Sequence, residues 1–560
     1  DRQIRQQCRL HILSFLNLNY RTAKTYTNVQ LSQGYSDVSQ LLEVETHTPD
    51  TSIVDRNEFL GNFQFYQLRV SNDWMIDSVN TFGFIFQAPV MKLGYRSQLC
   101  DYHMLSPQHS VNLNFTHIFD ANLERELTVN ADYHRSRQGS DNIQQLTSVT
   151  DSLRLDLSTQ QIVDIASVKL DFQTRFWQTG MIEAGVKYAF SHTDNRMVTD
   201  STMNFLPHSS TDNDCLYSEN VAAAYITVGK QFGQKFNAKL GLRGEYTYST
   251  GEWLTADSLN KYSYFNLFPT VFLGYNPTEQ WGMSASYTRR IKRPSYYILN
   301  PFRSYVDAHH YTSGNPALSP ELNNDVQLQF NWSQFVTVAG VFSHTQDMLN
   351  QSMMVLPNGD GAQTWVNFGT CTTHGVNASL TEFPIIPKKD AEGKRSLNNG
   401  GWLTLTVNAG YYNFINRSYD DSYVNRSHFW NTSANLTAYL PQFWTLMLNG
   451  DYSAPMTIGY QRTEASYGLD FGIRKVFPKQ GIILNLNAQD LLRSGDYRQT
   501  TQGAMAGTGG SMTSNPRQQR ITLSLIYNFG KQEWHKQRKV GQMDETSRLG
   551  GGGTGVGTGN

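Results

Sequence analysis

The stretch FNAKLGLRGEYTYS, Phe236–Ser249, decides the fold because its apolar and polar residues alternate. Positions of one parity carry phenylalanine, alanine, leucine, glycine and tyrosine. Positions of the other parity carry the polar and charged residues Asn237, Lys239, Arg243, Glu245 and Thr247. A period of two places the two sets on opposite faces of a strand. The stretch therefore predicts a strand with one apolar face and one charged face.

The same alternation recurs along the whole chain. It is found in FLNLNYR near residue 15, HSVNLNFTH from His109, SVKLDFQ from Ser167, WLTLTVNAGYY from Trp402, WTLMLNGDY from Trp444 and RITLSLIYNF from Arg520. These segments are about ten residues or longer and carry aromatics near their ends, which suits a tilted strand that crosses a bilayer. A soluble sandwich would need fewer strands per domain, with linkers between domains. The fold class predicted is all-β, a transmembrane antiparallel up-and-down β-barrel.

The composition agrees with this class. Of the 560 residues, 17% are charged and 12% are aromatic, and the mean hydropathy is -0.48. No apolar run is long enough for a membrane-spanning helix, although strands that alternate need no such run. The formal net charge is -1, so the chain lacks the overall basic character that attracts nucleic acid.

The connections between the predicted strands alternate in length, and this sets the orientation. Short ones such as NPTEQ, which starts at Asn276, are typical of periplasmic turns, and the long polar ones are typical of outer loops. One connection from Glu382, EFPIIPKKDAEGKRSLNNG, is long where a short turn is expected. Counting back from Arg520–Phe529 gives roughly twenty-one visible strands, of about twenty-two in a complete barrel.

The first visible strand, near His11–Arg21, runs downward, so we expect one strand and whatever precedes it upstream of Asp1. The domain division expected is a lead-in or outer loop at 1–10, a barrel at 11–530, and a flexible glycine-rich periplasmic tail at 531–560.

The stretch SYTRRIKRPSYYILNPF, Ser286–Phe302, combines basic residues, aromatics and two prolines. Because the preceding strand runs outward, we expect the basic cluster at the outer rim, where it would meet water or anionic lipid headgroups. Pro294 and Pro301 would stop the strand ladder and open a loop. A single basic patch on a neutral chain is weak support for a nucleic-acid site.

This stretch and its continuation, YTRRIKRPSYYILNPFRSYVDAHHYTSGNPALSPELNNDVQLQF, resemble the signature of the TonB-dependent-receptor-like outer membrane β-barrel family of Bacteroidetes. The matching motifs are RPSY at 293–296, LNPF at 299–302 and GNPxLxPE at 314–321, with Ser319 where lysine is common. YSENVAAAYITVGKQF and YFNLFPTVFLGY resemble the middle of that barrel, and the resemblance covers roughly residues 11–530.

The resemblance implies the barrel portion of a ligand-gated uptake protein in the outer membrane of a Gram-negative, Bacteroidetes-like cell. It implies outer-membrane lipid and lipopolysaccharide as surroundings. The partners it implies are a plug domain from an upstream segment, the TonB complex and a surface lipoprotein. The sequence itself contains no segment that resembles the regulatory-like domain, the plug or the TonB box of such proteins.

Candidate ligand-binding residues lie in the outer loop that follows the basic cluster: Arg293, Tyr296, Tyr297, Arg303, Tyr305, His309 and His310. Lys239, Arg243 and Glu245 are expected to face the lumen, where they would be solvated or contact a plug. Adjacent residues in a strand point apart, so a metal shared by His309 and His310 would need a special turn, and solvated histidines are the simpler interpretation.

Cofactor, metal and catalytic sites are not predicted. The four cysteines are widely spaced and form no CxxC pair, and Cys371 and His374 have opposite parity. No G-x-S-x-G or similar nucleophile motif occurs. The leading hypothesis is the one that the resemblance implies, receptor-like uptake without enzymatic activity. The alternative is a barrel that does not transport, serving as a binding or scaffold component of an outer-membrane secretion or assembly complex. The ligand cannot be deduced.

Overall fold

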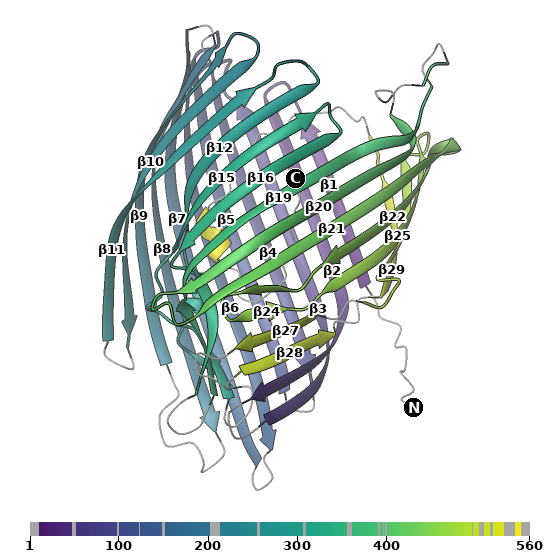
Figure 1. Cartoon of the computed structure of the whole chain (residues 1–560). Coiled ribbons are helices and arrows are strands. Elements are labelled where there is room, and N and C mark those ends of the chain that lie inside the picture. Colours follow the sequence, from purple (N-terminus) through teal and green to yellow (C-terminus); the bar gives the residue numbers. More distant parts are fainter. Residues whose placement is uncertain are drawn as a thin grey trace.

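The computed structural model of the chain describes residues 11–530 and 544–549. Within the first range it leaves out 48–51, 98–99, 123, 148–151, 178, 202–212, 255–257, 306–309, 356–360, 390–392, 396, 398–399, 495–496, 503–508 and 516–518. The described residues are almost entirely in strands, which wrap into a barrel (Figure 1). None of the described helices has the length and hydropathy needed to cross a membrane.

Twenty-one of the described strands form the barrel wall, as the sequence predicted. The first twelve are β1 (His11–Arg21), β2 (Thr25–His47), β3 (Ser52–Met75), β4 (Asn80–Arg96), β5 (Cys100–Asp120), β6 (Arg125–Thr147), β7 (Ser152–Phe176), β8 (Gly180–Ser201), β9 (Asn213–Phe232), β10 (Phe236–Trp253), β11 (Ser258–Tyr275) and β12 (Trp281–Lys292). The other nine are β15 (Glu321–Trp332), β16 (Val336–Gln346), β19 (Gly369–Pro387), β20 (Gly401–Ser418), β21 (Val424–Leu440), β22 (Trp444–Ser453), β25 (Ser466–Phe477), β26 (Ile482–Gln489) and β29 (Arg520–Tyr527).

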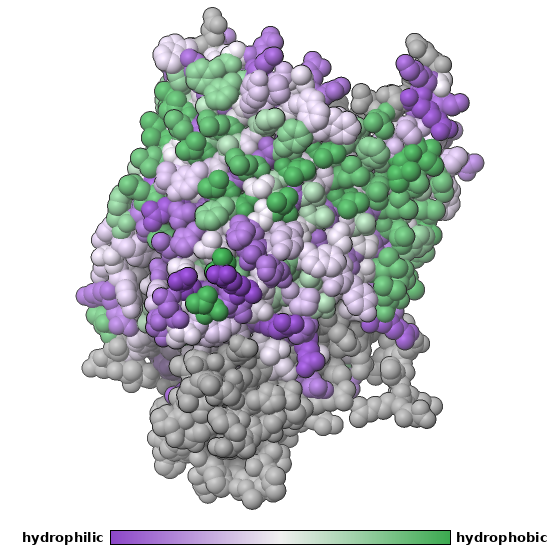
Figure 2. All heavy atoms as spheres, in the orientation of Figure 1, coloured by the Kyte–Doolittle hydropathy of each residue, from purple (hydrophilic) through white to green (hydrophobic). Residues whose placement is uncertain are grey.

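Each wall strand pairs antiparallel with its neighbours, and the alternation of the sequence becomes two faces. β10 pairs along its length with both β9 and β11. On its outer face Leu240 is 56% exposed, whereas Glu245 on the inner face is 5% exposed. Figure 2 shows apolar side chains gathered in a band across the barrel wall, with polar residues toward the ends. Apolar groups that face outward around a barrel wall suit lipid rather than water.

The remaining strands lie at the long-loop end of the barrel. They are β13 (Arg303–Tyr305), β14 (His310–Ser313), β17 (Leu349–Val355), β18 (Gly361–Asn367), β23 (Met456–Ile458), β24 (Gln461–Thr463), β27 (Tyr497–Gln502) and β28 (Gly509–Asn515). The first four form a separate small sheet in which β14 and β18 are parallel. The short helices described are α1 (Tyr296–Leu299), η2 (Pro441–Phe443) and η3 (Asp544–Leu549).

The barrel is nearly closed. In the part of the chain that the structure describes, β1 pairs with β2 and β29 pairs with β26, but β1 and β29 do not pair with each other. Beyond the end of β1 the free edge of β2 is taken over by β28, which pairs Gly509–Asn515 with Leu41–His47. The seam is therefore open beside β1 and joined at the long-loop end. A closing strand upstream of Asp1 stays a prediction.

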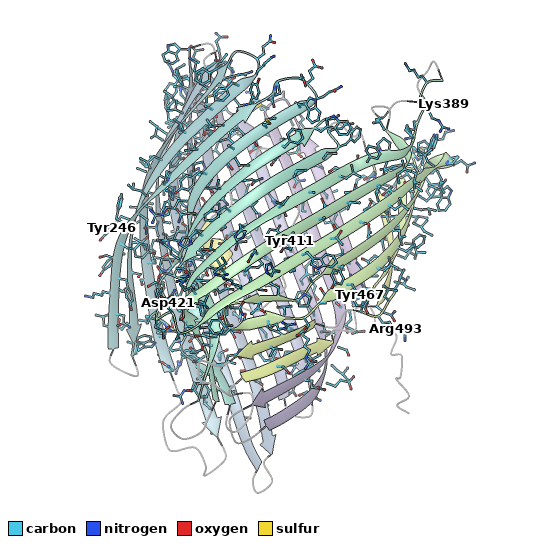
Figure 3. All side chains as sticks on the ribbon, in the orientation of Figure 1. Tyr246, Lys389, Tyr411, Asp421, Tyr467 and Arg493 are labelled. Carbon is cyan, nitrogen blue, oxygen red and sulfur yellow. The ribbon has the colours of Figure 1, made fainter. Side chains whose placement is uncertain are left out.

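The long connection from Glu382 has a structural explanation. β19 continues past Glu382 to Pro387 through register shifts, and Glu382 itself adopts a positive φ of 45°. Such bulges accommodate the prolines Pro384 and Pro387, which cannot donate to a regular ladder. The true connection runs from 388 to 400, and the Lys388 backbone N–H donates to the Gly400 carbonyl at 2.9 Å. Figure 3 shows Lys389 projecting at that end of the barrel.

Candidate ligand-binding site in the barrel lumen

Two buried carboxylates on neighbouring strands form the centre of the site. Glu219 of β9 is 2% exposed, and Glu245 of β10 is likewise buried on the inner wall face. A buried carboxylate is stable only with cationic or hydrogen-bonding partners. Arg293, the first residue after β12, supplies them: it forms an ion pair with Glu245, and its Nε lies 3.7 Å from Glu219 Oε1. It also donates to Thr247 Oγ1 at 2.9 Å.

Arg293, which belongs to the basic cluster, therefore does not lie where the sequence predicted. The expectation of an outer-rim position is wrong for Arg293, because the chain turns inward after β12 and the two carboxylates hold the guanidinium inside the lumen. Lys292, one residue earlier, is exposed and pairs with Glu321 at 3.0 Å. Neighbouring residues of one basic run thus point into different surroundings.

α1 fixes this inward turn by packing against the wall. Tyr296 is 2% exposed and packs on Val163 and Ile165, which lie on the inner face of β7. The ring of Tyr217 on β9 lies 6.3 Å from the ring of Tyr296. Buried aromatic rings of this size contribute strongly to packing. The RPSYYIL segment is therefore part of the lumen filling.

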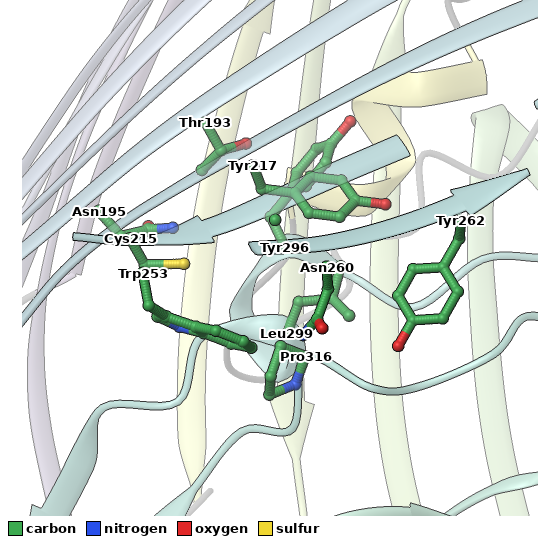
Figure 4. Close-up of a pocket in the computed structure, with 11 residues that line it drawn as sticks. Thr193, Asn195, Cys215, Tyr217, Trp253, Asn260, Tyr262, Tyr296, Leu299 and Pro316 are labelled. Atoms are coloured by element: carbon green, nitrogen blue, oxygen red, sulfur yellow. The ribbon is translucent and has the colours of Figure 1, made fainter. Parts of the chain in front are cut away.

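A small cavity lies between α1 and the strands β8 to β11 (Figure 4). It is lined by Thr193, Asn195, Cys215, Tyr217, Gly251, Trp253, Asn260, Tyr262, Tyr296, Leu299 and Pro316. Its volume of about 20 Å³ holds about one water. Thr193 Oγ1 and Trp253 Nε1 are buried there and have no hydrogen-bond partner among the described residues. The lining offers aromatic faces and amides, but α1 must move before a ligand larger than water can enter.

The three residues expected on the lumen face lie on β10 opposite its exposed leucines. Arg243 donates to Glu245 Oε2 at 2.7 Å through Nη2, so Glu245 has two arginine partners. Lys239 is half exposed and pairs with Glu183 of β8 at 3.2 Å. Lys239 is thus separate from the Glu219–Arg293–Glu245 cluster. A contact of these residues with a plug stays a prediction.

The predicted outer-loop residues divide into two groups. Arg293 and Tyr296 belong to the lumen, whereas Tyr297 is exposed and the Arg303 guanidinium lies 4.6 Å from the centre of the Tyr311 ring. The backbones of Tyr305 and His310 lie in β13 and β14, and His309 lies outside the described residues. Ligand binding by this set stays a prediction.

Glu219 was missed by the sequence reading. Its signal was present, because in YSENVAAAYITVGKQF it shares a parity with Tyr217 and Val221, which also face inward. A carboxylate on an inner face should have been paired with Glu245 as a lumen residue. Among the described residues, no group of three or more histidine, cysteine or acidic side chains could hold a metal ion.

Known structures with the same architecture include uptake receptors and transporters. The ferric yersiniabactin uptake receptor FyuA from Yersinia pestis aligns with a TM-score of 0.60 and 15% identity, over 90% of this chain and 78% of that one. The copper transporter OprC aligns with 0.64 and 10% identity over 90% and 79%. The ferric-catecholate import receptor Fiu from E. coli aligns with 0.57 and 11% identity over 90% and 80%. These likenesses show the fold alone.

A search of curated protein sequences gives no match. The sequence pattern of the outer membrane protein beta-barrel family, in contrast, matches residues 117–527, which is most of the wall. This family places the protein in the outer membrane of Gram-negative bacteria and is not enzymatic. The chain therefore belongs to the outer membrane protein beta-barrel family.

Proposed function

We propose that the chain is the wall of a receptor-like uptake protein that binds its ligand at the long-loop end and admits it through the lumen. The observation that carries the proposal is the position of α1. This helix joins the outer sheet, which is the small sheet of β13, β14, β17 and β18, to the buried charges of the lumen. A ligand that moved the outer sheet would thereby also disturb the pairs of Arg293. Such a segment is what a gate that responds to a ligand needs.

The first contact between α1 and the outer sheet is apolar. Ile298 and Leu299 are buried with Leu318, and Leu349 and Trp365 of the outer sheet pack on them. Tyr296, on the same short helix, packs on the lumen face of β7. One turn of helix therefore touches both the outer sheet and the wall.

The second connection is made by the GNP motif at 314–316. The Asn315 N–H donates to the Ile298 carbonyl at 2.7 Å, and the Asn315 side-chain amide donates to the Trp365 carbonyl at 2.9 Å. Gly314 passes so close to the Asn300 carbonyl that an added Cβ would lie 2.2 Å from its oxygen. The motif therefore acts as a strap that holds α1 beneath the outer sheet.

A plug, the TonB complex as energy source, a surface lipoprotein partner and a Bacteroidetes origin belong to this proposal through the motif resemblance. The names of the similar structures, which include a ferric yersiniabactin uptake receptor and a copper transporter, support uptake of a small solute. The cavity beside α1 offers aromatic and amide groups, and the charges of Glu219, Arg293 and Glu245 lie nearby in the lumen.

The experiment compares cells that lack the protein with cells that express it in full, each with and without a working TonB system. Solutes that disappear from the medium are measured by mass spectrometry. Uptake predicts one solute class depleted only when both protein and TonB are present. Depletion of no solute, together with a stoichiometric partner on purification, would establish the scaffold alternative instead.

The strap is tested by Gly314→Ala, with Gly340→Ala as matched control, because an added Cβ at Gly340 meets no atom within 4 Å. Displacing the strap should lower uptake by about tenfold, since a core overpacked by one methyl loses about 1–3 kcal/mol. The control should be unchanged, and both variants should insert into the membrane in normal amounts. Equal uptake by the two variants would contradict the coupling through α1.

A further inference from the structure

Part of the chain's own C-terminal region, residues 544–549, lies in the lumen. Of residues 531–560 the structure describes 544–549, which form η3, seen in yellow inside the barrel in Figure 1. η3 contacts β7 and α1. The domain division that places a flexible periplasmic tail at 531–560 stays a prediction for the rest of this range.

Two charges on η3 meet two opposite charges on the wall. Glu545 pairs with Lys187 of β8 at 2.9 Å, and Arg548 pairs with Glu219 of β9. All four side chains are at most 10% exposed. A 3-10 helix has three residues per turn, so residues three apart lie on the same face. Because of this spacing, Glu545 and Arg548 can both contact the wall.

The arginine is held by more than its ion pair. Arg548 Nε donates to the Pro294 carbonyl at 3.0 Å, and the guanidinium lies 4.4 Å from the centre of the Tyr296 ring. Leu549 packs against the apolar group of Val163, Ile165 and Tyr296. A planar cation stacked on a ring and bonded to a carbonyl and a carboxylate is a specific arrangement that lysine could not reproduce.

The two wall charges are set apart by the sheet register. Glu219 lies opposite Ser191, and Lys187 is four residues further along β8, which separates the two positions by about 13 Å. Glu545 and Arg548 reach these two positions through their long side chains. The wall therefore selects both the signs of the tail charges and their order.

From these contacts we propose that the lumen wall of β7 to β9, with Arg293 to Tyr296, is a binding site for a short peptide that carries a carboxylate and, three residues later, a guanidinium. The segment DETSRL is its intramolecular ligand. When seated, the segment occupies the space beside the Glu219–Arg293 pair and covers Tyr296. Its release would uncover Tyr296, which also lines the small cavity beside α1.

The test measures how well the full chain protects the bond after Arg548 from a protease that cleaves only after arginine. The initial rate of cleavage after Arg548 is measured by mass spectrometry for the folded protein and for the free peptide of the same sequence. Protection is the rate for the peptide divided by the rate for the protein. Proteolysis of an opened state follows its population, so about a hundredfold protection is expected in the parent chain. Folding of each variant is checked by its migration on unheated gels.

The charge pair Lys187–Glu545 supplies the variants. Lys187→Glu and Glu545→Lys should each lower protection by at least about tenfold, and the two together should restore it, because the swapped charges attract again. Asp132, the charged neighbour of both residues, sees one charge of each sign in either arrangement. Lys239→Glu is the matched control, because Lys239 faces the same lumen but pairs with Glu183.

The proposal is overturned if the parent chain is cut after Arg548 as fast as the free peptide. It is equally overturned if the double exchange is no better protected than the single ones, or if Lys239→Glu lowers protection as much as Lys187→Glu.

Discussion

β1 and β10 have the same alternating pattern but different surroundings. β10 is paired on both edges, and its inner face is buried at Glu245, Thr247 and Ser249, whereas its outer leucines and tyrosines are exposed. β1 is paired on one edge, and every residue along it is exposed, including Leu13 at 72%. The difference shows that alternation makes a strand, whereas neighbours on both edges and a filled lumen make a buried inner face.

Proline substitutions should separate the two strands most strongly. Successive N–H groups of a strand point to opposite edges. Gly241→Pro and Leu242→Pro in β10 should therefore each remove a ladder bond and cost more than about 3 kcal/mol, enough to impair assembly. Of Leu16→Pro and Asn17→Pro in β1, only the one whose N–H faces β2 should be as costly.

Assembly is followed by the heat-dependent gel shift and by denaturant unfolding in lipid. If both β1 prolines are as harmful as the β10 pair, another strand pairs with β1, which is the upstream strand predicted from the sequence.

The buried inner face is tested next by Arg293→Met. The methionine keeps much of the side-chain volume but removes the cation that Glu245 and Glu219 share. Each carboxylate keeps one arginine, Arg243 or Arg548, so the expected cost is about 3 kcal/mol in the free energy of unfolding. The control is Arg520→Met in β29 at the open seam, where the arginine is exposed and bonds Gln489. That change should stay within about 0.5 kcal/mol. Equal costs would mean that the lumen charges are solvated.

The outer faces are compared by Leu240→Arg and Leu446→Arg. A charge on the lipid face near mid-strand should cost about 2–4 kcal/mol in the free energy of unfolding from lipid. The matched inner-face changes, Arg243→Leu and Asn449→Leu, should cost much less, because Glu245 keeps Arg293 as its partner. If the inner and outer changes are equally harmful, the assignment of the two faces is wrong.

The smallest effect is expected in the turns. The Asp420 carboxylate accepts hydrogen bonds from Ser418 and Ser422, which lower its pKa to about 2. Because this folded-state pKa lies below the usual 3.8, the bonds stabilise the β20–β21 turn above about pH 4, and that stabilisation is lost as the pH falls toward 2. Hydrogen exchange at Ser422 should show this loss.

Asp420→Asn should remove the pH response of that turn. The β1–β2 turn is the comparison, because the hydroxyl of Thr22 accepts there from the Thr25 N–H and does not titrate in this range. A parallel acid response in both turns would point to general unfolding rather than to Asp420.

Local pattern explains how much could be predicted. The wall, its strand number and the inner position of Glu245 follow from period two, which each strand repeats. The inward turn of Arg293 could not be predicted, because Pro294 ends the alternation and the direction is decided by Glu219, distant in sequence. The position of Arg548 beside Glu219 could not be predicted for the same reason, because a glycine-rich tail has no periodicity that indicates a partner.

The pairing of β28 with β2 has a consequence for folding. It joins the second wall strand to a segment near the end of the wall, so almost the entire chain lies between the partners. Contacts between such distant segments carry a large loop-closure entropy and form late. β28 can therefore pair with β2 only after the intervening strands are in register. In an incompletely assembled wall, the outer half of β2 would be paired with β3 alone, and its other edge would be free.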